Sequence, residues 1–127
     1  MSWIFTPDKP VFIQIAERMT RFIISGEYPT GKQIPTVRQI ALEATVNPNT
    51  VQKALTLLES EGLIFSKSTL GKFVTEDNSL IDGYRKKVAQ KTAESFLISM
   101  KEIGLSPEES MEILESKLKE LSTENII

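Results

Sequence analysis

The 127-residue sequence predicts a mainly α-helical chain with one small β-hairpin. Three observations favour this fold class. Apolar residues recur at three- and four-residue spacing over most of the chain, which is the period of one helical face. Capping residues and helix-terminating glycines divide that pattern into separate helices. Two short runs rich in β-forming residues, 63–67 and 72–75, interrupt the helical pattern and enclose a turn at 68–71.

The first predicted helix covers residues 10–25, and Gly26 suits the left-handed conformation that ends a helix. Its apolar face consists of Val11, Ile15, Met19, Phe22 and Ile23. A turn containing Pro29 and Gly31 comes next. We expect Ile34, directly after this turn, to form a short edge strand.

A second, short helix is expected to begin after Thr36 and to end near residues 44–45. Thr36 and Gln39 have the spacing of a capping box, in which each side chain bonds the backbone amide of the other residue. The third helix is expected over 48–61, with Asn47 as its N-cap and Pro48 at its first position. Its apolar stripe is Val51, Ala54, Leu55 and Leu58, and Gly62 predicts a Schellman ending.

Residues 76–79 are polar and are typical of a linker, with Asn78 or Ser79 as the cap of the next helix. That helix is expected to be long and to end at Gly104, and another helix begins at the capping box of Ser106 and Glu109. The spacing predicts that these two helices form an αα-hairpin. Their shared apolar stripe is Phe96, Met100, Met111, Leu114, Leu118 and Leu121.

Three helices and then a hairpin give the order of a winged helix-turn-helix, in which the third helix enters the DNA major groove. The sequence therefore predicts a winged helix-turn-helix DNA-binding domain over residues 1–77. Residues 78–127 are expected to form a two-helix dimerisation arm, because two helices cannot bury both their apolar faces against each other and also enclose a ligand. An effector pocket or an ordinary core are the alternatives for this arm.

Composition narrows the function. The chain has no cysteine and no histidine, so a thiolate nucleophile, an imidazole base and the usual zinc ligands are all missing. We therefore expect no enzyme activity, no metal and no cofactor. The net charge of −2 means that DNA binding must depend on locally placed cations.

The location of the protein is inferred by similar reasoning. The first residues lack the charged and apolar regions of a signal peptide, and no stretch approaches the roughly 20 apolar residues of a membrane span. A cytoplasmic protein with no membrane partner is expected. The absence of cysteine agrees with a reducing compartment.

The third helix carries a polar face opposite its apolar stripe. That face consists of Asn49, Gln52, Lys53 and Thr56. Such side chains can bond adenine edges, guanine or phosphate. A solvated outer face is the alternative, but the position of this helix between a first helix and a wing favours double-stranded DNA.

Arg38, in the first turn of the second helix, is a further candidate DNA contact, and a surface ion pair with Glu43 is the alternative. The predicted wing tip adds Lys67, Thr69, Gly71 and Lys72. There a glycine lets backbone approach phosphate or a minor groove. Taken alone, this would be an ordinary hairpin.

These residues resemble the GntR family of bacterial transcription regulators, and within it the YtrA-like subfamily. The family pattern of Pro-x-Gly and Leu-Pro-Ser-x-Arg is matched by Pro29 to Gly31 and by residues 34–38, and its Gly-Leu-Ile wing by residues 62–74. Residues 46–54 look YtrA-like, with Pro48 where other subfamilies usually have arginine. The family pattern has glycine where Thr45 stands, and a basic residue and glycine where Ser68 and Thr69 stand.

The resemblance implies a homodimer that binds a pseudo-palindromic operator, usually as a repressor, and often controls an ABC transporter. Matching DNA-contacting positions are Arg38, Asn47, Asn49, Thr50, Gln52 and Gly71, and Thr36 stands at the serine of the same motif. Two alternatives stay open. One is a winged-helix module that binds a protein, and the other is a ligand-responsive regulator with a small-molecule effector between the terminal helices.

Overall fold

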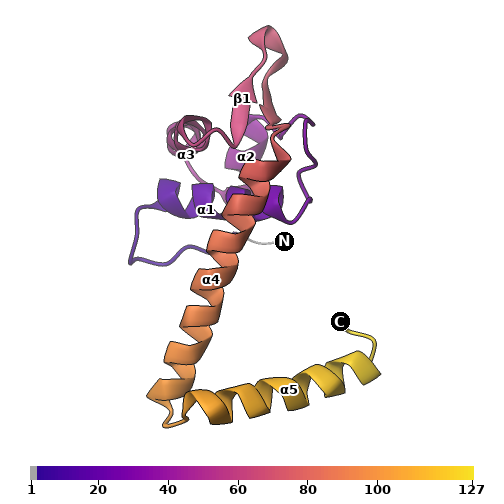
Figure 1. Cartoon of the computed structure of the whole chain (residues 1–127). Helices are drawn as coiled ribbons and strands as arrows, with labels where there is room; N and C mark the ends of the chain where they lie inside the picture. The colour runs from indigo at the N-terminus through magenta and orange to yellow at the C-terminus, as the bar shows by residue number, and fades with distance from the viewer. Residues whose placement is uncertain (1–2) are drawn as a thin grey trace. The chain divides into compact units, whose positions relative to one another are not determined.

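The fold is a set of five α-helices and one two-stranded antiparallel sheet, seen in a computed structural model that describes residues 3–127 (Figure 1). In chain order the elements are α1 (Val11–Ile24), α2 (Val37–Ala44), α3 (Pro48–Ser60), β1 (Ile64–Ser66), a 3₁₀ turn η1 (Ser68–Leu70), β2 (Lys72–Val74), α4 (Asn78–Glu102) and α5 (Pro107–Thr123). The predicted fold class is confirmed.

The chain divides into two compact units, Met1–Arg85 and Lys86–Ile127, so α4 belongs to both. The first unit extends beyond residue 77 because the first turns of α4 pack on it. Ile81 is buried there. The Tyr84 hydroxyl donates to the Glu61 carboxylate at 2.9 Å, and the Arg85 guanidinium donates to the Ile24 carbonyl at 2.7 and 3.0 Å.

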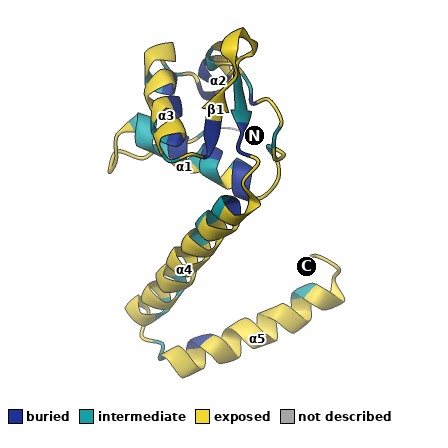
Figure 2. Ribbon diagram, turned by 45° about the horizontal axis from the view of Figure 1, so that its top comes forward, coloured by how far each residue is buried: buried dark blue, intermediate teal, exposed yellow. Residues whose placement is uncertain are grey.

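The core of the first unit lies between α1, α3 and the hairpin. α1 contributes Ile15, Met19 and Ile23, which are at most 2% exposed. The predicted α3 stripe is also confirmed as core, since its four residues are at most 1% exposed. Figure 2 shows these buried segments in α1, α3 and β1, whereas the residues of α5 are almost all exposed.

The predicted start of α2 and both predicted ends of α3 are confirmed in atomic detail. The Thr36 hydroxyl accepts the Gln39 amide proton and the Gln39 side chain accepts the Thr36 amide proton, at 3.1 and 2.8 Å. Asn47 caps α3 through its side-chain oxygen. At the other end, the amide of Leu63 donates to the Leu58 carbonyl, which is the Schellman bond.

The turn between α2 and α3 is built on a left-handed residue that is not glycine. Thr45 has φ 58° and ψ 50°, and its amide donates to the Ala41 carbonyl. The amide of Val46 donates to the same carbonyl at 3.1 Å. This left-handed geometry favours glycine, so Thr45 holds the bend under backbone strain.

The hairpin forms as predicted, with Phe65 opposite Phe73 in register. The edge strand expected at Ile34 is reduced to a single bridge, one residue earlier in the chain. Gln33 makes a single bridge to Phe73, and Ile34 instead buries its side chain in the core. A single bridge forms here because the chain leaves the hairpin to cap α2 directly afterwards.

The second unit holds the end of α4 and all of α5, which meet at the turn that the sequence predicts. The predicted αα-hairpin is wrong, because α5 leads away from the end of α4 and the two helices do not pack along each other (Figure 1). The capping box of Ser106 and Glu109 is present, and Gly104 has φ 89°.

The predicted cap of α4, which begins in the first unit, is wrong. The Asp77 side chain, and not Asn78 or Ser79, accepts the Leu80 amide proton at 3.1 Å. Asp77 takes this place because the helix begins one residue earlier than expected.

Replacing Thr45 with glycine should stabilise the protein. The left-handed conformation destabilises an L-residue by roughly 1–2 kcal/mol, and glycine removes this cost. Glycine also has greater freedom in the unfolded chain, which offsets roughly 0.5–1 kcal/mol of the gain. We expect the free energy of unfolding to rise by roughly 0.5–1 kcal/mol in urea titrations. Thr45→Ala is the control, because it keeps the Cβ atom and should gain less. An unchanged or lower stability for Thr45→Gly would contradict the strain at this turn.

Candidate nucleic-acid interface

The outer face of α3 carries polar side chains that the rest of the molecule leaves free. Asn49, Gln52 and Lys53 are exposed, and their side chains have no partner in the part of the chain that the structure describes. Thr56 is exposed too, but its hydroxyl donates to the Gln52 carbonyl at 2.9 Å. The first three side chains are therefore the ones available for hydrogen bonds to another molecule.

At the start of α3, by contrast, side chains take part in contacts within the protein. The Asn47 side-chain oxygen accepts the Asn49 amide proton at 2.8 Å, so this residue keeps only its NH₂ group for an outside acceptor. Thr50 is half-buried. Helix N-termini favour anions, so a phosphate beside Asn47 would meet both the amide group and the positive end of the helix.

Arg38 lies exposed in the first turn of α2, two residues after the cap Thr36. The alternative of an ion pair with Glu43 is not observed, and among residues 3–127 Arg38 forms no salt bridge. The Thr36 hydroxyl serves the capping box and can only donate its own proton outward. Arg38 is thus the free cation of this helix.

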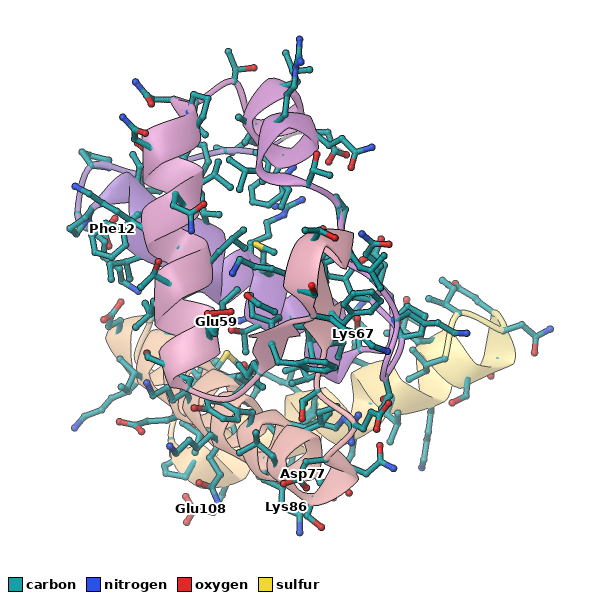
Figure 3. All side chains as sticks on the ribbon, turned by 90° about the horizontal axis from the view of Figure 1, so that it is seen from above. Phe12, Glu59, Lys67, Asp77, Lys86 and Glu108 are labelled. Carbon is teal, nitrogen blue, oxygen red and sulfur yellow. The ribbon has the colours of Figure 1, made fainter. Side chains whose placement is uncertain are left out.

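The base of the wing is tied to α3. The Lys72 ammonium donates to the Glu59 carboxylate at 2.9 Å and to the Ser66 hydroxyl at 2.8 Å, and the Ser66 hydroxyl donates to the same carboxylate at 2.7 Å. Figure 3 labels Glu59 on the side of α3 that faces the wing. Lys72 is therefore paired within the protein, so it reaches a phosphate only by leaving Glu59.

These contacts also set the charge state of Glu59. The Ser66 hydroxyl and then the Lys72 ammonium hold the pKa of this carboxyl below its ordinary value of 4.5. The ionised carboxylate in turn neutralises the charge of Lys72. The wing therefore presents its positive charge mainly at its tip.

The tip consists of the turn η1 and its neighbours. Lys67 stays exposed, with its ammonium 5.4 Å from the centre of the Phe73 ring, and Thr69 is exposed on η1. Gly71 has φ 110°, a conformation that other residues rarely adopt. Lys67, Arg38 and Lys53 form no salt bridge among the described residues, so within the predicted DNA-binding set they are the cations left for phosphates.

Two residues that hold the wing were missed by the sequence reasoning. Glu59 binds Lys72 across 13 residues, and Gln33 reaches the wing tip across 37. No local signal marks either one, because their partners are remote in sequence. The predicted face itself came from local spacing alone.

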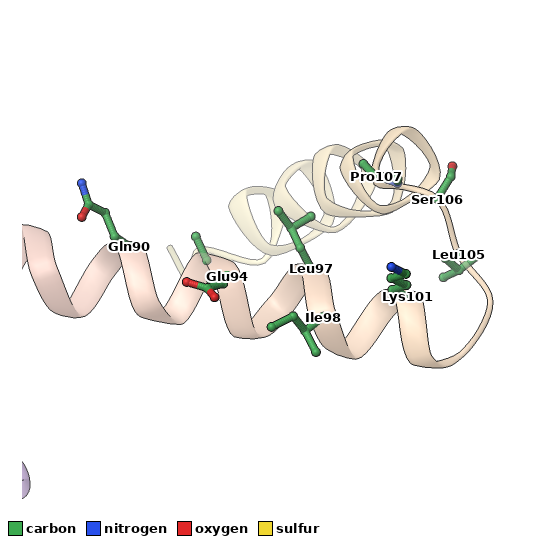
Figure 4. Close-up of a pocket in the computed structure, with 9 residues that line it drawn as sticks. Gln90, Glu94, Leu97, Ile98, Lys101, Leu105, Ser106 and Pro107 are labelled. Atoms are coloured by element: carbon green, nitrogen blue, oxygen red, sulfur yellow. The ribbon is translucent and has the colours of Figure 1, made fainter.

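The second unit carries an apolar surface. Met111, Leu114 and Leu118 are 45–52% exposed, while Phe96 and Met100 are half-buried. A shallow hollow of about 720 Å³ lies where α4 turns into α5 (Figure 4). Its lining includes Ala93, Leu97, Ile98, Leu105 and Pro107. Among residues 3–127, no helix has the length and apolar content needed to cross a membrane.

Comparisons with known proteins agree with this geometry. The protein-family model described as "Bacterial regulatory proteins, gntR family" matches residues 13–74 of this chain. The HTH-type transcriptional regulator YhcF of Bacillus subtilis is 32% identical over 108 residues, which cover 85% of this chain and 89% of that protein. The HTH-type transcriptional repressor YtrA of Bacillus subtilis is 34% identical over 76 residues, covering 58% of each chain.

Solved structures are similar as well. A GntR family transcriptional regulator from Listeria monocytogenes matches with a TM-score of 0.78 and 29% identity, covering 88% of this chain and 98% of that one. The AraR DNA-binding domain in complex with operator ORX1 matches with a TM-score of 0.54 and 26% identity, covering 59% of this chain and 95% of that one. The chain is thus similar to whole regulators and to a domain solved on its operator.

Glu59 makes the stability of the first unit depend on pH. Because its pKa is lowered by folding, its contribution is fully present above pH 4.5 and is lost as the pH falls through the lowered value. Glu59→Gln should therefore be less stable than the natural protein at pH 7, by under about 1 kcal/mol for this partly exposed pair.

The difference should shrink as the pH falls below 4.5. Thermal unfolding of both proteins across this range checks the prediction. Glu94→Gln removes a carboxylate on α4 and is the control. A difference that stays the same from pH 7 to pH 3 would refute the role given to Glu59.

Proposed function

Because the chain belongs to the gntR family of bacterial regulatory proteins, we propose that it binds a pseudo-palindromic operator as a homodimer and represses transcription. The chain is a transcription regulator with a helix-turn-helix DNA-binding domain, and not an enzyme. The proposal adds the operator, the assembly and the direction of regulation to this identity.

One observation carries the proposal. The four residues of the α3 stripe are at most 1% exposed. On the opposite side, Asn49, Gln52 and Lys53 are exposed, and their side chains form no hydrogen bond among the described residues. A helix anchored on one side, with free hydrogen-bonding groups on the other, suits insertion into a major groove. The structurally similar AraR DNA-binding domain was solved in complex with an operator, which supports DNA binding by this fold.

We assign the contacts by chemistry. Asn49 and Gln52 can form two hydrogen bonds each with an adenine edge, and Lys53 can bind guanine or phosphate. Arg38 and Lys67 are placed on phosphates, since both are free cations. The remaining members of the proposed DNA-binding set are Thr36, Asn47, Thr50, Thr56, Thr69, Gly71 and Lys72. Within this set, Lys72 contributes by holding the wing through Glu59 unless a phosphate replaces that carboxylate.

We assign DNA binding to residues 1–77 and dimerisation to residues 78–127. The half-exposed residues of α5 are an apolar surface that a second copy of the chain would cover. Two joined copies would present two α3 helices about 34–36 Å apart, which fits half-sites about 10 base pairs apart. The repressor name of the relative YtrA supports repression.

The cellular setting is inferred from the same resemblance. We place the regulator in the cytoplasm, where bacterial DNA lies, and we propose a transporter operon as its target because YtrA-like regulators often control one.

A small-molecule effector is a second candidate, favoured by the hollow beside Leu97 and Ile98. Apolar hollows of this size accept small ligands. Thermal-shift measurements against a panel of metabolites and drugs test it, and a ligand that also changes DNA affinity would support it. No shift with any compound would leave dimerisation as the use of this surface.

Selection of bound duplexes from a random DNA pool tests the main proposal. We expect enrichment of a pseudo-palindrome with half-sites about 10 base pairs apart. Asn49→Ala and Gln52→Ala should each reduce discrimination at one base position by about 1–3 kcal/mol in titrations at fixed salt. Asn78→Ala removes an exposed side-chain amide at the start of α4, outside the hollow, and is the matched control. If no sequence is enriched, a module that binds a protein becomes the better explanation.

Sedimentation equilibrium tests the assembly. Leu118→Glu places a charge in the apolar surface of α5, so we expect a shift from dimer to monomer and loss of tight binding to the full palindrome. Ser116→Glu adds the same charge to the opposite side of α5 and should remain dimeric. A natural chain that is monomeric yet binds one half-site tightly would overturn the dimer.

A further inference from the structure

Among residues 3–127, one side chain from outside the hairpin, that of Gln33, forms a hydrogen bond to the wing tip. This residue lies between α1 and α2 and bridges Phe73 of β2 through the backbone. Its side-chain amide then extends along the hairpin and donates to the Leu70 carbonyl, at the last residue of η1. A residue far from the tip in sequence thus caps the end of the turn.

The backbone around Gln33 fixes where its side chain starts. The Ile34 amide donates to the Lys72 carbonyl at 3.0 Å, and the Val74 amide donates to the Lys32 carbonyl at 2.9 Å. These bonds attach residues 32–34 to the outer edge of β2. Ile34, next in the chain, is buried in the core. The side chain of Gln33 is therefore anchored to the rigid part of the unit at one end and to the wing tip at the other.

Gly71 makes room for this contact. A Cβ atom at Gly71 would lie 2.7 Å from the Gln33 side-chain nitrogen, closer than atoms of these kinds approach. Its φ of 110° also disfavours any other residue. The contact with Gln33 and the positive φ therefore explain a glycine at position 71 from within the protein, in addition to any approach of its backbone to DNA.

The tip has little else to order it. Ser68, Thr69 and Leu70 are exposed, and Ser68 has a positive φ of 51°. Inside the tip, the Lys67 amide donates to the Gly71 carbonyl and the Leu70 amide to the Lys67 carbonyl. Glu59 holds the wing at Ser66 and Lys72, below the tip. Among residues 3–127, the amide of Gln33 makes the one hydrogen bond from outside the wing to residues 68–70.

We propose that Gln33 is a positioning residue for DNA recognition, which holds the wing tip so that Lys67 meets a phosphate. This inference rests on the proposed function. An ordered tip loses less conformational freedom on binding, so its contacts add more to affinity. Gln33 is neutral and is assigned no contact with DNA, so its effect must pass through the tip.

The first test measures order without DNA. In Gln33→Ala, the amides of Lys67 and Leu70 should exchange hydrogen several-fold faster than in the natural protein, while the amides of α3 keep their rates. Asn78→Ala removes an exposed side-chain amide from the start of α4 and should change neither. Unchanged exchange at the tip would show that Gln33 does not hold it.

The second test uses the duplex that the natural protein selects from the random pool. Gln33→Ala should bind it about three- to tenfold more weakly. The slope of log affinity against log salt should become shallower by roughly 1.8, the value for two lost phosphate contacts, one from Lys67 of each protomer, although no charge has been removed. A merely structural loss would leave this slope unchanged, and that result would overturn the inference.

A double-mutant cycle links the two residues. Lys67→Gln removes the charge of the ammonium that lies over the Phe73 ring, and adding Gln33→Ala to it should cost little further affinity. Fully additive losses would show that Gln33 acts elsewhere. If the natural protein selects no duplex, the proposed function fails; if it selects one that Gln33→Ala binds equally well, this inference alone fails.

Discussion

The burial of one side of α3 is the constraint on which the arrangement of the first unit depends. A helix repeats every 3.6 residues, so fixing Val51, Ala54, Leu55 and Leu58 in the core also fixes which residues face away from it. Removing these side chains from water contributes on the order of 1–3 kcal/mol each. The polar residues opposite them need no partner within the protein, so the exposed side of α3 stays open to another molecule and is the surface that we propose reads DNA.

The wing depends on α3 and on the segment before α2. Glu59 ties the base of the hairpin to the end of α3, and Gln33 ties its tip to the segment that leads into α2. Both ties are polar and exposed, so each contributes little to stability. Their effect is on geometry, because they keep the tip and the α3 surface in a fixed relation. If α3 and the wing tip contact adjacent parts of a duplex, as we propose, that fixed relation matters more than extra stability.

The second unit differs from the first in how much apolar surface it buries. Its helices are well capped, yet much of the apolar surface of α5 is left open to solvent. Helical stability in proteins comes mostly from packing of an apolar face, which caps cannot replace. The order of such a unit is expected to come from a partner that covers it, and a second copy of the chain is the partner that we propose.

The sequence by itself determined the features that depend on neighbouring residues. The caps at Thr36, Asn47 and Ser106, the Schellman bond after α3 and the α3 stripe are interactions within a few residues, so their spacing predicts them. Only the tertiary structure decided the rest. It pairs Lys72 with Glu59, places Gln33 against the wing tip and joins the start of α4 to the first unit. These contacts join residues far apart in the chain, and no local pattern encodes which distant partner folding will bring within reach.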